Sequence, residues 1–170
     1  MSTPWIRQTV LFILLVFLQV WLFNKIHIGG FATPLVYIYF IIKLPVEMNR
    51  NMVLLIAALI GLTIDLFTFT LGLNMLATVI AGFSRTYLLK LFAPKNVYES
   101  FSPSLATFGK ALFLRYAFLI ILLHQIVLFV TESFSFFEPL QLVLRITGSY
   151  LLTLFLVYAF EKIQLGKIKS

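Results

Sequence analysis

Three ionisable residues lie inside apolar stretches of this sequence: Asp65, His124 and Arg145. Placing such a side chain in the hydrocarbon of a membrane costs about 2.5–3.5 kcal/mol on insertion scales, so each residue is a candidate for function. If the apolar stretches cross a membrane six times, all three residues fall in its outer half, and we expect Asp65 and Arg145 to approach each other. An acid, an imidazole and a guanidinium at one depth could relay protons or hold a polar substrate.

Each of these residues also has a structural interpretation, which we favour. Asp65 lies where two helices are predicted to turn, and its carboxylate could cap that turn. Arg145 could extend toward Glu138 or a lipid phosphate, as long basic side chains near helix ends do. His124 could form a hydrogen bond between helices. These interpretations predict a role in stability for all three residues.

The patterns that usually mark catalysis or metal binding are absent. The sequence contains no HExxH, P-loop or GxSxG pattern and no cysteine. Two histidines far apart, His27 and His124, do not make a metal site without clustered carboxylates. We therefore expect no enzymatic activity, no catalytic residues, no metal and no cofactor. A membrane enzyme, the alternative, would need His124 paired with Asp65 or Glu132 as acid and base.

The composition is that of a polytopic integral membrane protein. Of 170 residues, 61% are hydrophobic and 11% are charged, and the mean hydropathy is +1.03. A soluble domain has about a quarter of its residues charged. The net charge of +7 comes from single basic residues between apolar runs. Loops on the cytoplasmic face explain this excess, so we expect the lipid bilayer as the environment and no nucleic acid as a partner.

The apolar runs predict a single all-α transmembrane domain over residues 1–170, built as a bundle of about six helices. The second run is the shortest, with Thr33 and Pro34 predicted as N-cap and first helical residue and Pro45 ending the helix. The expected spans are 8–24, 32–46, 51–66, 70–91, 111–131 and 139–160, with the main cytoplasmic loop over 92–110.

The distribution of Lys and Arg predicts the orientation of the chain. With six spans, eleven basic residues lie on the cytoplasmic side, Lys25 alone lies outside and Arg145 is embedded. A five-span chain without the 32–46 segment gives the same ratio with the N-terminus outside. The C-terminus is therefore expected in the cytoplasm in both cases. We prefer six spans, which place the N-terminus there too.

Residues 51–84 carry one charge, Asp65, and predict a tight pair of antiparallel helices that turns near 65–72. Small residues at four-residue spacing allow close approach of helix backbones in lipid. Those residues are Ala57, Gly61, Ala77, Ala81 and Gly82.

This hairpin resembles the core signature of the rod shape-determining protein family MreD, of the Bacteroidetes type. Gly61, Asp65 and Gly72 stand at the positions of that signature, followed by Leu73, Asn74, Ala77 and Ala81. The segment FLQVWLFNKIHIGGFATPLVYIYFIIKLP is also similar to the start of these proteins. The resemblance covers most of the chain.

The resemblance implies a non-enzymatic component of the bacterial inner membrane that acts in cell elongation. It implies MreC as a partner, together with MreB filaments and the peptidoglycan synthases of the lateral wall. Gly61, Asp65 and Gly72 would be architectural. The family's fold is similar to the substrate-binding components of energy-coupling-factor transporters, so a vitamin-binding transporter subunit is the alternative function. The alanine-x-x-x-alanine face typical of those subunits is missing from the first span, which has no alanine.

Overall fold

The computed structural model describes residues 4–29, 31–70, 72–92, 101–133 and 138–169, and these ranges are helical with no strand. An isolated bridge between Ile28 and Ala32 closes a turn. The elements are α1 (Pro4–Trp21), the 3-10 turn η1 (Phe23–Lys25), α2 (Ile38–Lys43), α3 (Arg50–Thr68), α4 (Leu73–Phe92), α5 (Leu105–Phe108), α6 (Lys110–Glu132) and α7 (Pro139–Lys169).

Five helices in the described ranges are long and apolar enough to cross a membrane, as a multi-pass membrane protein requires. They give candidate spans at Gln8–Lys25, Arg50–Thr68, Leu73–Phe92, Lys110–Glu132 and Pro139–Gly166. The expectation of a sixth helical span over 32–46 is corrected, because only the six residues of α2 are helical there.

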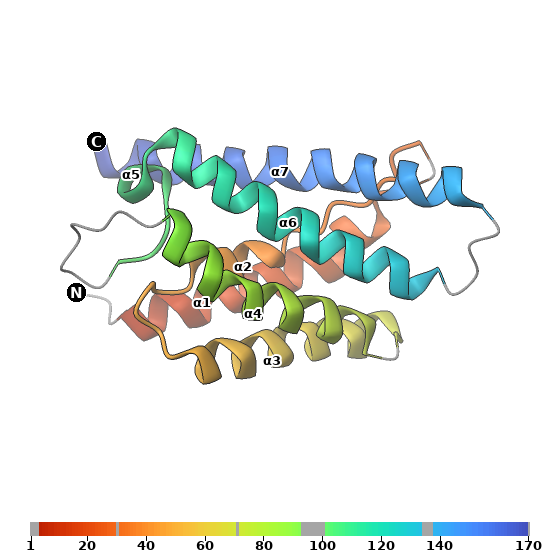
Figure 1. Cartoon of the computed structure of the whole chain (residues 1–170), viewed down its shortest axis with the longest axis horizontal. Coiled ribbons are helices and arrows are strands. Elements are labelled where there is room, and N and C mark those ends of the chain that lie inside the picture. The colour runs from red at the N-terminus through yellow and green to blue at the C-terminus, as the bar shows by residue number, and fades with distance from the viewer. Residues whose placement is uncertain (1–3, 30, 71, 93–100, 134–137, 170) are drawn as a thin grey trace.

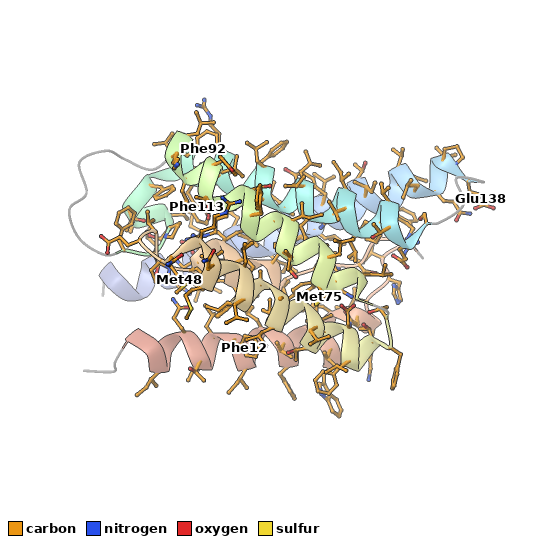
Figure 2. The ribbon with its side chains drawn as sticks, turned by 60° about the horizontal axis from the view of Figure 1, so that its bottom comes forward. Phe12, Met48, Met75, Phe92, Phe113 and Glu138 are labelled. Atoms are coloured by element: carbon orange, nitrogen blue, oxygen red, sulfur yellow. The ribbon has the colours of Figure 1, made fainter. Side chains whose placement is uncertain are left out.

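From α3 on, each long helix runs antiparallel to the one before it, whereas α1 and α3 run in the same direction, because the segment with α2 returns between them (Figure 1). α1 begins, α2 ends and α3 begins at one end of the bundle, where α4 also ends, α6 begins and α7 ends. Most basic residues are close to these termini, so we call this the basic end; Met48 lies there and Glu138 lies at the opposite end (Figure 2). The described basic residues near it are Lys43, Arg50, Arg85, Lys90, Lys110, Arg115 and Lys162.

The segment that leads into α2 passes through the interior of the bundle. Residues 35–44 are all buried, and α2 contacts α1, α4 and α6. The expected helix start at Thr33–Pro34 is wrong: residues 33–35 are not helical, and the first helical residue is Ile38. The hydroxyl of Thr33 instead lies 2.8 Å from Nδ1 of His27. α2 ends at Lys43, two residues before Pro45, as expected from the proline.

Helices α3 and α4 pack closely along their small residues, as the sequence predicts. Ala57, Ala77 and Ala81 are fully buried, and Gly61 and Gly82 are buried too. Thr78 of α4 donates a hydrogen bond to the carbonyl of Ala57 in α3 (2.8 Å). These small side chains therefore lie inside the bundle, where they allow α3 and α4 to approach each other closely.

Two further segments differ in form from what the sequence suggests. The expected span 139–160 is part of a longer helix, because α7 continues through Glu161 to Lys169. Within the expected loop 92–110, residues 93–100 lie outside the described residues, and Leu105–Phe108 forms the short helix α5. Ser104 caps α5, because its hydroxyl accepts a hydrogen bond from the amide of Thr107 (3.1 Å).

Gly61→Ala should destabilise the protein by about 1–3 kcal/mol, because the added methyl group has no room. Its Cβ would lie 2.3 Å from Oγ1 of Thr78 and 2.4 Å from Cα of Met75, so the two helix backbones would have to move apart. Thermal unfolding in detergent measures the change. Gly166→Ala is the matched control, since its Cβ would meet nothing within 4 Å. Equal melting temperatures for the two variants would contradict this packing.

Candidate functional site

Asp65 holds the turn between α3 and α4 with its carboxylate. Oδ1 accepts hydrogen bonds from the hydroxyl of Thr70 (2.5 Å) and from the backbone amide and side-chain amide of Asn74 (3.0 and 2.9 Å). Oδ2 accepts from the backbone amide of Met75 (2.9 Å). Amides in the first turn of a helix have no partner within that helix, and negative charge is favourable there. The structural interpretation of Asp65 therefore agrees with its contacts.

The carboxylate is also the first member of a buried hydrogen-bond chain that reaches the centre of the bundle. The hydroxyl of Tyr37 donates to Oδ1 of Asn74 (2.7 Å) and lies 3.0 Å from Nε2 of His124. The Tyr37 and His124 rings also meet edge to face, with centroids 5.3 Å apart. We call Asp65, Asn74, Tyr37 and His124 the Asp65 network; it joins α3, α4, the segment before α2, and α6.

The direction of each hydrogen bond in the Asp65 network follows from its first member. Both carboxylate oxygens of Asp65 accept from backbone amides, and the amide nitrogen of Asn74 also donates to Asp65, so the oxygen of Asn74 faces Tyr37. The single hydroxyl proton of Tyr37 is then used on Asn74, and Nε2 of His124 must donate to Tyr37. In that tautomer Nδ1 of His124 is the acceptor; it is buried and has no hydrogen-bond partner in the described residues.

Arg145 does not belong to this network. Its guanidinium donates to both carboxylate oxygens of Glu132 (2.8 and 2.9 Å) and lies 5.0 Å from the ring centre of Phe129. Both Glu132 and Phe129 are in α6, the neighbour of α7. The expected approach of Arg145 to Asp65 is therefore wrong, because α6 supplies its acidic partner at the same end of the bundle.

A second set of side chains compensates for the missing helical hydrogen bonds of residues 33–37. The amides of Val36 and Tyr37 donate to Oε1 of Gln19 (2.7 and 3.4 Å), and Nε2 of Gln19 donates to the carbonyl of Pro34 (3.0 Å). Gln19 is fully buried in α1, so α1 supplies one side of this support. We call Gln19, Ser149 and Thr153 the Gln19 cluster.

The other side of the Gln19 cluster comes from α7. The amide of Thr33 donates to the hydroxyl of Ser149, and the amide of Leu35 donates to that of Thr153, both at 2.9 Å. Pro34 has no amide hydrogen, so every backbone donor from 33 to 37 has a side-chain acceptor. Non-helical backbone at membrane depth is tolerated only where protein surrounds it in this way.

Charged residues form a third set at the basic end, the Glu161 cluster of Glu161, Lys43 and Tyr39. Oε1 of Glu161 accepts from Nζ of Lys43 (2.7 Å) and from the hydroxyl of Tyr39 (2.5 Å). Oε2 accepts from the backbone amide of Leu105 (3.0 Å), the first residue of α5. The cluster is buried and ties α2 and α5 to α7.

Arg85 of α4 adds a further buried cation beside the Glu161 cluster. Its guanidinium donates to the carbonyls of Leu44 and Pro45, which follow the last turn of α2. Carbonyl groups at the end of a helix lack helical partners and favour a positive charge. Arg85 therefore fixes the point where the buried segment leaves the bundle.

Sequence reasoning missed Gln19, Tyr37, Lys43, Arg85 and Glu161 as members of these sets. Gln19 carried a usable signal, because it is a polar residue in the middle of the apolar run between Gln8 and Asn24. Lys43 ends α2, whereas Arg85 and Glu161 lie inside α4 and α7. The sequence alone does not distinguish a buried charge at these positions from a solvated one near the membrane surface.

The polar side chains of the interior are used for packing and for backbone support. Within the described ranges, no group of three or more His, Asp or Glu side chains is placed to hold a metal. The comparisons with protein-family models, with curated proteins and with solved structures find no match. A proposal for the function must therefore rest on the geometry of the chain and on the sequence motif around Asp65.

Gln19→Leu should destabilise the protein by about 1–3 kcal/mol, because it leaves the amide of Val36 and the carbonyl of Pro34 buried without partners. Thermal unfolding in detergent measures this loss. Gln8→Leu is the matched control on the same helix, since no described residue gives Oε1 of Gln8 a hydrogen bond. A similar small change in both variants would show that Gln19 does not support the buried segment.

Proposed function

We propose that this chain is a non-enzymatic, multi-pass component of the bacterial inner membrane that acts in the cell-elongation machinery. It partners MreC and couples MreB filaments to lateral peptidoglycan synthesis. The observation that carries the proposal is the use of Asp65, the charged residue of the MreD-like signature. All four hydrogen bonds to its carboxylate come from the turn and first turn of α4, as an architectural residue requires.

The other signature residues support the same role. Gly61 allows α4 to contact the backbone of α3, and Gly72 has a positive φ of 77° directly before α4. Glycine adopts that backbone conformation without steric cost. Each residue of the signature thus shapes one hairpin, which is consistent with a scaffold whose surface, rather than a reactive centre, carries the function.

The surface of α1 and α3 is suited to association within a membrane. These two helices contact each other, and both expose large apolar side chains on the side away from the core. Helices in lipid associate by shape fit, because lipid tails are as apolar as the side chains. The exposed residues include Ile6, Val10, Ile13, Phe17 and Trp21 on α1 and Met52, Leu55, Leu59, Leu62 and Leu66 on α3.

In the proposed topology both ends of the chain lie in the cytoplasm. The start of α1 and the end of α7 lie at the basic end of the bundle (Figure 1), and basic residues favour the cytoplasmic side. The MreD resemblance also implies a fold similar to the substrate-binding components of energy-coupling-factor transporters. A vitamin-binding subunit is therefore the function that a test must distinguish from the scaffold.

A C-terminally tagged copy, purified from native membranes in mild detergent, should retain MreC and elongation synthases, which mass spectrometry identifies. An untagged strain is the control for non-specific recovery. Recovery of paired ATPases and a membrane coupling subunit, without MreC, would overturn the scaffold proposal in favour of a transporter.

Asp65→Ala should lower the amount of folded protein in the membrane, because four hydrogen bonds and the charge at the start of α4 are lost. Capping losses of this kind cost about 0.5–2 kcal/mol each. Quantitative immunoblotting and thermal unfolding in detergent measure the effect. Asp65→Asn, which keeps one acceptor oxygen, should be intermediate. Normal abundance combined with lost rod shape would instead place Asp65 in a contact with a partner.

A further inference from the structure

An apolar groove of about 450 Å³ lies open on the outside of the bundle near its basic end. Its lining comes from the end of α4, the first turns of α6 and the middle of α7; Figure 2 shows Phe92 at the end of α4. The lining residues are Phe92, Leu114, Arg115, Phe118, Leu119 and Leu154. Its volume is in the range of small-molecule sites, and Arg115 is its one polar residue.

Arg115 differs from the other arginines whose side chains the structure describes. Arg85 is buried on carbonyl groups, Arg145 pairs with Glu132, and Arg50 lies 4.1 Å from the ring centre of Phe83. Arg115 is exposed, and no described residue gives it a hydrogen bond, ion pair or ring contact. A free guanidinium at a lipid-facing groove is therefore available for an external anion.

The position of Arg115 along α6 sets the geometry of the site. It follows the first residue, Lys110, by five positions, or about 7.5 Å of helix. A side chain at that depth can extend to the membrane interface while its methylene groups remain in the groove. Leu119 continues the apolar lining one turn deeper, and Leu154 of α7 covers its far side.

We infer that this groove binds one anionic phospholipid. Its acyl chain lies against Leu114, Leu119 and Leu154, and its phosphate accepts hydrogen bonds from the planar guanidinium of Arg115. No lining residue is acidic, and the exposed cation Lys90 lies on α4 at the same end of the bundle. A headgroup with net negative charge fits these surroundings better than a zwitterionic one, whose ammonium group is repelled.

Native mass spectrometry of the full-length protein in detergent tests the site with two probes, phosphatidylglycerol and phosphatidylethanolamine with identical acyl chains. The wild type should bind one phosphatidylglycerol more tightly than phosphatidylethanolamine. Arg115→Gln should weaken phosphatidylglycerol binding at least about ten-fold, and the control Lys110→Gln only about two-fold, because Lys110 is outside the groove. Leu119→Trp should lower binding by filling the groove while Arg115 remains.

Thermal unfolding in the same detergent shows that each variant is folded before its binding is compared. Equal binding of the two lipids by the wild type would overturn the proposal, as would equal losses in Arg115→Gln and Lys110→Gln. A polypeptide that co-purifies with the wild type and is displaced by Leu119→Trp, with no phospholipid displaced, would make the groove a helix-docking site. The lipid proposal would then also be wrong.

Discussion

The non-helical backbone of residues 33–37 in the middle of a helical bundle is the constraint on which this structure depends. Lipid offers no hydrogen bonds, so each backbone group at that depth must find a partner in the protein. Gln19, Ser149 and Thr153 provide these partners from α1 and α7. Helices α1 and α7 must therefore both lie against residues 33–37, and this requirement fixes their positions next to the segment that leads into α2.

The two ends of the bundle are stabilised by different chemistry. The end with the α3–α4 turn depends on one carboxylate that receives amide and hydroxyl donors, and the Asp65 network extends from it to His124. The basic end depends on a buried ion pair and on Arg85, which meets the carbonyls after α2. Truncating one partner of a buried ion pair leaves an uncompensated charge and costs about 3–5 kcal/mol. Both ends therefore fix α2 in place along the length of the bundle.

Much of the architecture could be predicted from the sequence, because apolar length and small-residue spacing act locally. The α3–α4 hairpin, its turn near Asp65 and its buried alanines follow from such patterns. The conformation of the 32–46 segment could not be predicted, since average hydropathy does not distinguish a lipid-facing helix from a buried segment that is only partly helical. Nor could the partner of Arg145, because Glu132 and Asp65 are equivalent acids until the packing of α6 against α7 is known.

The supports of the 33–44 segment also set an order for its biogenesis. Ser149, Thr153 and Glu161 follow the groups that they bind by 116, 118 and 122 positions along the chain. A ribosome that feeds this chain into a membrane releases the segment long before α7 is made. The segment therefore reaches its final conformation only after the last helix has been made. The last step of folding is the packing of α7 against the segment that contains α2. Until then the amides of Thr33 and Leu35 lack their acceptors, whereas Gln19 of α1 is already available to the amides of Val36 and Tyr37.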